Sequence, residues 1–225
     1  MRTLIVSCLA LTALFAITLA TDPEVPIWRD QFSQTFTETT KYKILGSHDT
    51  AGTYYYDWTN NRARTDRDNG RWDRYCGFNG LKFFKNTPCT QLVVDGMRWM
   101  IYPELKECCA CCSAAHGCGV LKPSWVSAGK YIGQTSATDG TPLYKWDVKG
   151  GQSNYYYETV QDNPADRVMH EIYQVSDDDQ IFDISSLSEN IDESVWALPD
   201  YCDASKTCSF LSVCNAVSHF IKLPQ

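Results

Sequence analysis

The stretch QLVVDGMRWMIY, residues 91–102, holds the clearest β-hairpin signal in the sequence. Asp95-Gly96 at its centre tolerates the positive φ angles of a two-residue turn, and apolar runs flank it on both sides. We therefore predict antiparallel strands over 91–94 and 97–102, joined by a tight turn.

Strand chemistry extends along the chain, because aromatic residues make up 13% of the sequence and recur in short runs between Gly, Asn and Asp turns. Period-two spacing places Phe32, Phe36, Tyr42 and Ile44 on one face of a long strand. The other expected strands share this apolar-run signature. Together the expected strands cover residues 30–45, 53–58, 62–66, 81–85, 130–132, 143–148, 154–159, 167–175 and 180–184.

Such a pattern predicts a mainly β protein built on a single antiparallel sheet system, with residues 21–225 as one disulfide-rich domain. Helices alternating with strands, the mark of a parallel α/β fold, are absent from the pattern. We expect tight turns at Asn69-Gly70 and Gly150-Gly151, a short helix or irregular segment over 122–128, and one helical turn over 192–196.

The first twenty residues read as a secretory signal. Met1-Arg2 supplies a positive start, residues 4–19 are apolar, and Ala20 and Thr21 are small enough for cleavage. This apolar run is short for a membrane span, and no later run is longer. The expected product is a secreted protein, extracellular or in a secretory-vesicle lumen, without a transmembrane segment.

Export decides how the cysteines are interpreted. Removal of the signal takes away Cys8 and leaves an even number, which permits five disulfides in an oxidising compartment. Adjacent Cys108 and Cys109 point to different sides, so they should bond to different partners. We expect residues 108–118 to interrupt the strand series as a loop stapled over the middle of the sheet. The expected disulfide cysteines are Cys76, Cys89, Cys108, Cys109, Cys111, Cys112, Cys118, Cys202, Cys208 and Cys214.

Other uses of the cysteine cluster fit less well. Its spacing lacks the two separated pairs of a closed zinc site, and it lacks the helix-start context of a thioredoxin-like Cys-x-x-Cys motif. No metal site is expected, and a thiol–disulfide redox protein stays as a third alternative.

Net charge argues against nucleic acid as a partner. The formal charge is −7, and the one basic run, between Arg62 and Arg74, is interleaved with Asp57, Asp66, Asp68 and Asp73. We interpret that run as a solvated strand-and-turn surface.

Catalytic signatures are not found in the sequence. It contains no Gly-x-Ser-x-Gly motif, and an even cysteine count leaves no spare thiol beside a histidine. Asp177-Asp178-Asp179, at an expected hairpin turn, could bind calcium weakly, but it lacks the EF-hand spacing and a solvated turn is favoured. We predict neither catalytic residues nor a cofactor.

The aromatic strands are the remaining candidates for a binding site. Aromatic side chains on the faces of a curved sheet can line an apolar cavity, the usual form of a small-molecule site. Ordinary core packing is the alternative for each residue taken singly. The predicted ligand-binding residues are Tyr54, Tyr56, Trp58, Trp99, Tyr102, Trp146, Tyr156 and Tyr173.

Three segments give the chain a family likeness. Tyr55-Tyr56-Asp57 followed by Arg62-Ala63-Arg64, the hairpin region 89–102, and the closing segment 195–202 together resemble the secreted ependymin-related proteins and the wider group of curved-sheet lipid carriers that includes bacterial lipoprotein carriers. The resemblance implies a strongly curved antiparallel sheet, a half-barrel with helices across its mouth, holding a hydrophobic ligand.

These observations predict a secreted, non-enzymatic binding protein for a lipid or other apolar small molecule. The alternative is a secreted cysteine-rich interaction or structural protein, for example an adhesion, coat or protease-regulating domain. In that case residues 108–118 would recognise another secreted or surface protein.

Overall fold

The computed structural model describes residues 21–149, 153–175, 178–210 and 212–214. The expected signal at 1–20, Cys8 and the Gly150-Gly151 turn lie outside the described residues. No helix among the described residues is long and apolar enough to cross a membrane.

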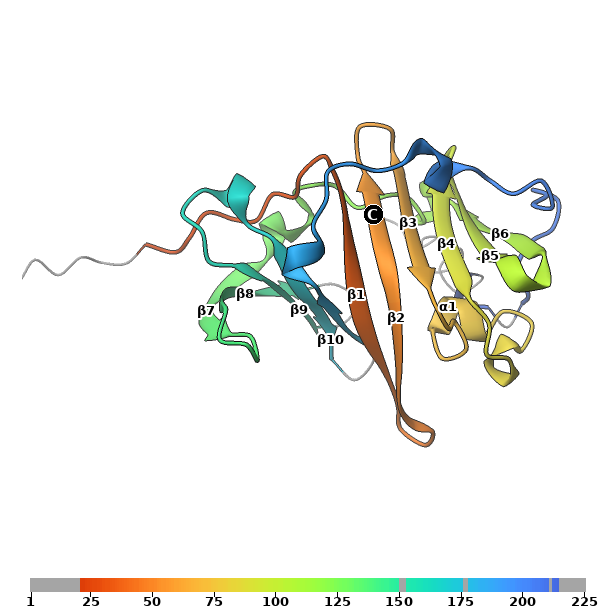
Figure 1. The fold of residues 1–225 in the computed structure, drawn as a ribbon, viewed down its shortest axis with the longest axis horizontal. Coiled ribbons are helices and arrows are strands. Elements are labelled where there is room, and N and C mark those ends of the chain that lie inside the picture. The colour runs from red at the N-terminus through yellow and green to blue at the C-terminus, as the bar shows by residue number, and fades with distance from the viewer. Residues whose placement is uncertain (1–20, 150–152, 176–177, 211, 215–225) are drawn as a thin grey trace, which may run out of the picture.

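One antiparallel sheet of 11 strands organises the protein, in the order β6-β5-β4-β3-β2-β1-β11-β10-β9-β8-β7 (Figure 1). The sheet is not closed, because β6 and β7 lie at its two edges. The strands are β1 (Gln31–Tyr42), β2 (Gly46–Asp57), β3 (Arg62–Arg67), β4 (Cys89–Val94), β5 (Met97–Tyr102), β6 (Glu107–Ser113), β7 (Lys130–Ser136), β8 (Pro142–Lys149), β9 (Ser153–Thr159), β10 (Met169–Gln174) and β11 (Asp178–Phe182).

Helices are few and short. Seven of them are single 3-10 turns, one is the α-helix α1 (Arg74–Gly77), and Val213 and Cys214 are also α-helical among the described residues. The 3-10 turns are η1 (Lys82–Phe84), η2 (Pro103–Leu105), η3 (Ala114–His116), η4 (Trp125–Ala128), η5 (Pro164–Asp166), η6 (Ile184–Ser186) and η7 (Glu193–Trp196). The segment 122–128, expected to be a short helix or irregular, contains η4, and the helical turn expected over 192–196 is confirmed as η7.

The path of the chain explains the strand order. From β1 to β6 successive strands step outward to one edge, and from β7 to β11 they step back from the other edge until β11 pairs with β1. Residues 114–129, which we call the crossing segment, therefore run from one edge of the sheet to the other (Figure 1). The segment is held over the central strands, since the Tyr56 hydroxyl donates to the Leu121 carbonyl at 2.8 Å and the Trp28 amide donates to the Pro123 carbonyl at 3.0 Å.

The hairpin of residues 91–102 is confirmed. Val94 pairs with Met97, and Asp95 and Gly96 have φ angles of 51° and 72°. Both positive values match the two-residue turn that the dipeptide predicts.

Two turn and strand expectations were wrong. Asn69-Gly70 forms no hairpin: β3 ends at Arg67, and the Gly70 amide donates to the Thr87 carbonyl at 2.8 Å. Glycine is required there for space, because a Cβ on Gly70 would lie 2.4 Å from the Cβ of Cys89, beside the Cys76–Cys89 disulfide. The expected strand over 81–85 is instead the 3-10 turn η1, which begins after Leu81 in the left-handed region at φ 61°.

Alternation divides the sheet into an aromatic face, which carries Phe36, Tyr54, Tyr56, Trp146 and Tyr156, and an opposite face. On the aromatic face, a core centred on those residues is covered by Trp28 and the crossing segment. A second core near Met100 and Tyr102 is covered by α1 and the C-terminal segment, and the opposite face carries a third core around Trp99 and Trp196. Phe32 and Phe36 lie on the aromatic face as expected, whereas Ile44 lies beyond the end of β1 and is 94% exposed.

Five disulfides are present, as the even cysteine count predicts. They are Cys76–Cys89, Cys108–Cys202, Cys109–Cys208, Cys111–Cys214 and Cys112–Cys118.

The position of the cysteine cluster corrects the sequence expectation. Residues 108–112 are not a loop over the middle of the sheet; they belong to the edge strand β6. Strand alternation sends Cys108 to the opposite face, where it bonds to Cys202, and Cys109 to the aromatic face, where it bonds to Cys208. The expectation that these two neighbours bond to different partners is confirmed.

Candidate functional site

Two adjoining cavities open on the aromatic face, between its two covered cores. The first, which we call the apolar cavity, has a volume of about 220 Å³. Phe36 of β1, Tyr54 of β2 and Phe182 of β11 contribute to its floor, while Trp28 and the crossing segment cover it. Its lining residues are Trp28, Phe36, Tyr54, Thr65, Leu121, Trp125, Asn154, Ile172, Gln174, Gln180 and Phe182.

The floor depends on one glycine. Gly52 pairs with Phe36 across β1 and β2, and a Cβ there would lie 2.7 Å from the Phe36 ring and 2.0 Å from the Asp66 carbonyl oxygen. The absence of a side chain at Gly52 lets the Phe36 ring lie flat over β2. On its other side the ring contacts Phe182, its cross-strand partner on β11, with a centroid distance of 5.6 Å.

Trp28 is the centre of the cover. Its ring makes edge contacts with Phe32, Tyr56 and Trp125 at centroid distances of 5.5, 5.2 and 5.4 Å. Its indole Nε1 donates to the Tyr156 hydroxyl at 2.9 Å. A buried indole paired in this way is fixed in orientation, so the wall of the cavity is preformed.

The second cavity, which we call the charged cavity, has a volume of about 400 Å³ and shares Thr65, Gln174 and Gln180 with the apolar cavity. Its ionisable lining residues are Glu38, Arg67, Asp73, Arg74 and Asp178. The two cavities therefore form one site, apolar at one end and charged at the other.

A buried ion pair forms the charged end. Arg67, only 6% exposed, donates from Nε and Nη2 to the two carboxylate oxygens of Glu38, the Nη2–Oε1 distance being 2.8 Å. Its Nη2 also lies 3.4 Å from Oδ2 of Asp73, and Gln180 Nε2 donates to Glu38 Oε1 at 2.7 Å. Such a fork between planar groups fixes both side chains.

Protonation at this end follows from burial and neighbouring charge. Burial opposes the charged form of Arg67, but the carboxylates of Asp73 and Glu38 outweigh it and raise the pKa. Burial also raises the pKa of Asp73, and it raises the pKa of Asp178 to about 6 with help from the charges of Glu38 and Asp73.

The sequence expectation of a solvated basic run is wrong for Arg67. A signal for its burial existed in the alternation of β3: Ala63, Thr65 and Arg67 share the aromatic face, whereas Arg62 and Arg64 point to the other side. Ten of the eleven residues that line the apolar cavity were also outside the predicted set, Trp28, Phe36, Leu121, Trp125 and Phe182 among them.

The eight predicted ligand-binding residues divide into two groups. Tyr54, Tyr56, Trp58, Trp146 and Tyr156 all belong to the core on the aromatic face, and Tyr54 lines the apolar cavity itself.

The other three lie elsewhere. Trp99 packs in the core of the opposite face, and Tyr102 packs beside the Cys76–Cys89 disulfide. Tyr173 lies on the opposite face, where its ring stacks on Tyr155 at 6.2 Å. The structure therefore does not bring these three to the apolar cavity.

Two residues of the acidic run lie in a strand and not in the expected turn. Asp178 and Asp179 are successive residues of β11, so their carboxylates point to opposite faces of the sheet. Asp177 lies outside the described residues.

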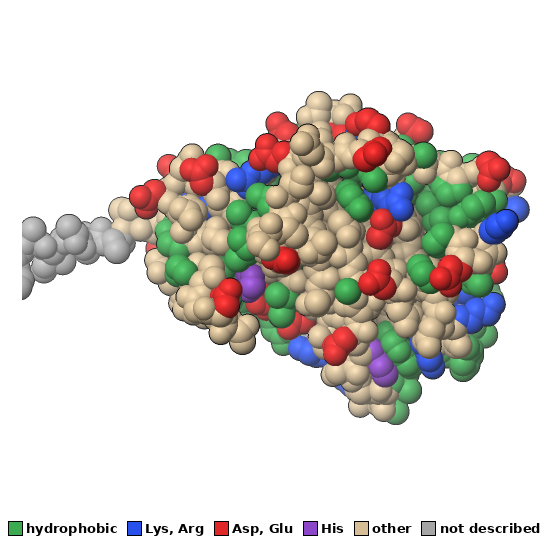
Figure 2. All heavy atoms as spheres, viewed as in Figure 1, with side chains coloured by type: hydrophobic (Ala, Val, Ile, Leu, Met, Phe, Trp, Pro, Cys, Tyr) green, Lys and Arg blue, Asp and Glu red, His purple; other side chains and the backbone are tan. Residues whose placement is uncertain are grey.

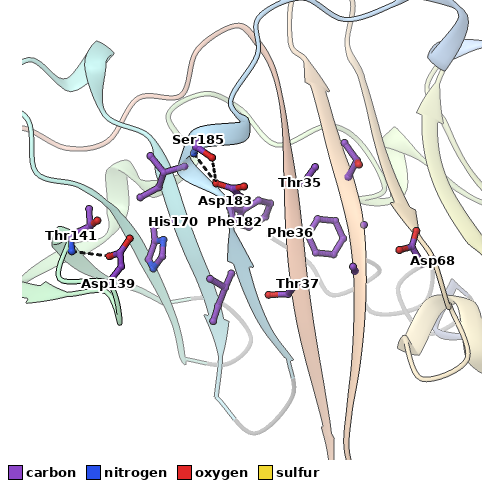
Figure 3. Close-up of a pocket in the computed structure, with 15 residues that line it drawn as sticks. Thr35, Phe36, Thr37, Asp68, Asp139, Thr141, His170, Phe182, Asp183 and Ser185 are labelled. Carbon is purple, nitrogen blue, oxygen red and sulfur yellow. Dashed lines mark hydrogen bonds between the residues drawn. The ribbon is translucent and has the colours of Figure 1, made fainter.

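A wider depression, of about 880 Å³, lies around Thr35, Thr37 and His170 (Figure 3). Two of its carboxylates accept hydrogen bonds from backbone amides two residues further along the chain. Asp139 accepts from the Thr141 amide at 2.9 Å, and Asp183 accepts from the Ser185 amide at 2.8 Å. Burial lowers the pKa of His170, which favours the neutral imidazole. The depression is wide and open, whereas the apolar cavity is covered.

Surface charge agrees with the net charge of the chain. Figure 2 shows acidic side chains spread over the face drawn, interspersed with Lys and Arg. The protein is acidic as a whole, with a formal charge of −7.

Comparison with known proteins gives no family. No family model matches the chain, and no curated protein matches it. Among solved structures, an uncharacterized conserved protein from Thermus thermophilus is 9% identical, with a TM-score of 0.46 over 76% of this chain and 86% of that one. A chain described as an outer membrane lipoprotein-sorting protein domain, from Vibrio parahaemolyticus, is 8% identical, with a TM-score of 0.37 over 74% of this chain and 88% of that one. At these scores neither likeness assigns a fold family or a function.

Proposed function

We propose that this protein is a secreted, non-enzymatic binding protein for a lipid or other apolar small molecule. The observation that carries the proposal is the apolar cavity of about 220 Å³, walled by aromatic rings and covered by the crossing segment. Enclosed apolar sites with a few polar groups at one end are the usual form of small-molecule sites.

A strongly curved, half-barrel sheet is part of this proposal. In a flat sheet, β2 and β9 would lie four strand spacings apart, or about 19 Å. Yet the single side chain of Trp28 contacts Tyr56 of β2 at 5.2 Å and hydrogen bonds to Tyr156 of β9. Curvature toward the aromatic face accounts for both contacts, and it agrees with the resemblance to ependymin-related proteins and curved-sheet lipid carriers.

Binding at such a site needs no acid–base chemistry. Apolar burial contributes about 25 cal/mol per Å², so a ligand that buries roughly 200 Å² gains about 5 kcal/mol before the costs of association. Polar groups at the mouth then orient the ligand. We therefore propose no catalytic residue and no cofactor.

Secretion is proposed from the sequence signal at residues 1–20, with 21–225 as the mature domain. Five disulfides are compatible with an extracellular setting.

The two alternatives draw less support from the cysteine cluster. Within residues 108–118, Cys108, Cys109 and Cys112 are buried in β6, so a recognition surface there would be limited to the exposed residues 114–117. All ten cysteines of the described residues are in disulfides, which leaves no thiol there for redox exchange.

Binding of the fluorescent apolar probe N-phenyl-1-naphthylamine to the oxidised mature protein tests the proposal. We expect saturable binding to the wild type, and loss of binding in Ile172→Trp, which fills the apolar cavity from β10. Ile181→Trp, on the exposed side of β11, is the matched control and should bind as the wild type does. Absence of saturable binding to the wild type, or loss of binding in the control alone, would contradict the proposal.

A further inference from the structure

Two buried polar atoms at the charged end have no hydrogen-bond partner among the described residues. One is the guanidinium Nη1 of Arg67, a donor on a side chain that is 6% exposed; the other is the carboxylate Oδ1 of Asp178, an acceptor. Both residues line the charged cavity. Buried polar groups are almost always hydrogen-bonded, so this pair calls for a bound group that accepts from one and donates to the other.

The charges of the cavity limit what that group can be. Three carboxylates, those of Glu38, Asp73 and Asp178, line the cavity together with two guanidinium groups, those of Arg67 and Arg74. With all five ionised the lining has one net negative charge, so an anionic headgroup would meet repulsion. An ammonium group could donate to Asp178, but it has no lone pair to accept from Arg67 and would add a cation beside it.

A hydroxyl group meets both requirements, because it donates one hydrogen bond and accepts others without bringing a charge. The shared lining of Thr65, Gln174 and Gln180 connects the charged end to the apolar cavity. A single molecule can therefore occupy both ends.

We propose that the ligand is an apolar alcohol, whose hydrocarbon part lies in the apolar cavity and whose hydroxyl accepts from Arg67 Nη1 and donates to Asp178 Oδ1. This inference rests on the proposed function and adds the class of headgroup. Burial and the charges of Glu38 and Asp73 raise the pKa of Asp178, in agreement with a headgroup that adds no negative charge.

Three probes with the same chain and different heads test it: octan-1-ol, octanoate and octylammonium. Their affinities for the oxidised mature protein are measured at pH 7.5 by displacement of N-phenyl-1-naphthylamine and by calorimetry. We expect octan-1-ol to bind about tenfold more tightly than either charged probe, because each of those leaves a buried group unpaired or repelled.

Asp178→Asn assigns the effect to this carboxylate. Asparagine keeps the shape and an acceptor oxygen but removes the charge, so octanoate should gain about tenfold while octan-1-ol changes little. Asp179→Asn is the matched control, because it makes the same change one residue later on the opposite face. It should leave the order of the three affinities as in the wild type.

The outcomes separate this inference from the proposed function. Tightest binding by octanoate or octylammonium, or an unchanged gap between octanol and octanoate in Asp178→Asn, overturns the alcohol proposal while leaving apolar binding in place. Failure of all three octyl compounds and of N-phenyl-1-naphthylamine to bind the wild type overturns both.

Discussion

The hydroxyl of Tyr56 donates a hydrogen bond of 2.8 Å to the backbone carbonyl of Leu121. Tyr56 lies on β2, near the centre of the sheet, whereas Leu121 lies midway along the segment that crosses from one edge to the other. The bond therefore holds the cover of the apolar cavity to the sheet beside it.

Loss of this bond should loosen the cover. Tyr56 is fully buried, so Tyr56→Phe leaves the Leu121 carbonyl without its donor and should lower the free energy of unfolding by about 1–2 kcal/mol. Urea unfolding measures the change. Tyr55→Phe, the same substitution on the opposite face, serves as the control; equal losses in the two variants would show that the bond to Leu121 contributes nothing specific.

Removal of one partner of the Arg67–Glu38 pair should lower the unfolding free energy more than removal of both partners. Arg67→Met leaves the carboxylate of Glu38 buried without its cation, and we expect a loss of about 3–5 kcal/mol in unfolding free energy. Glu38→Met combined with Arg67→Met removes both charges of the pair and should recover part of that loss, because the buried carboxylate of Asp73 still lacks its cation. Thermal and urea unfolding of the two single variants and the double variant form the cycle. Strictly additive losses would contradict this account.

Local signals in the sequence predicted local structure well. The Asp95-Gly96 hairpin follows from residues adjacent in the chain, and the shared face of Tyr54 and Tyr56 follows from alternation alone. By contrast, the pairing of β1 with β11 joins Phe36 to Phe182, and no short-range pattern specifies a partner so distant.

The site was harder to predict than the strands, for a physical reason. Trp28 and Leu121 lie in segments without strand or helix periodicity, so their positions over the cavity depend on tertiary contacts. Gly70 resembled a turn residue because close packing and positive φ both require glycine, and the sequence does not distinguish the two causes. Aromatic residues occur on both faces of the sheet, and the sequence does not distinguish those that line the cavity from those that pack in the other cores.

Glu171 should make stability depend on pH. Burial and the neighbouring charge of Asp179 raise the pKa of Glu171 in the folded protein to about 7, above its ordinary value of 4.5. The folded state therefore binds more protons than the unfolded state between these values. The contribution of Glu171 to stability is thus fully present below pH 4.5 and is lost as the pH rises through 7.

Glu171→Gln, which cannot ionise, is the variant that tests this dependence. The melting temperature of the variant should exceed that of the wild type at pH 8, and the difference should shrink toward pH 4.5. Melting curves across this range provide the measurement. A difference that stays constant with pH would assign the pH dependence to other groups.

Removal of one long-range disulfide should lower the unfolding free energy by less than the length of its loop predicts. Cys109–Cys208 joins residues 99 apart, for which loop entropy alone gives about 4.7 kcal/mol. Cys108–Cys202 lies beside it, however, and already holds the two segments together in the unfolded chain. Replacing Cys109 and Cys208 with serine should therefore lower the unfolding free energy by about 2–3 kcal/mol, the value for a ring of under ten residues.

Cys76–Cys89, with a sequence separation of 13 and no parallel bridge, is the reference for that experiment. Its removal should cost about 3 kcal/mol, at least as much as removal of the longer bridge. Urea unfolding of both serine pairs under non-reducing conditions compares them. A loss near 5 kcal/mol for the Cys109–Cys208 pair would show that the bridges act independently.

The bridge between Cys108 and Cys202 encloses the crossing segment and all five strands from β7 to β11. A protease that cuts the backbone once anywhere inside this ring produces two pieces that remain covalently attached. Each piece keeps its strands in the shared sheet, so the cut chain stays one molecule until its disulfides are reduced. A protein built in this way can tolerate a nick in the cover of its own cavity and still retain both walls.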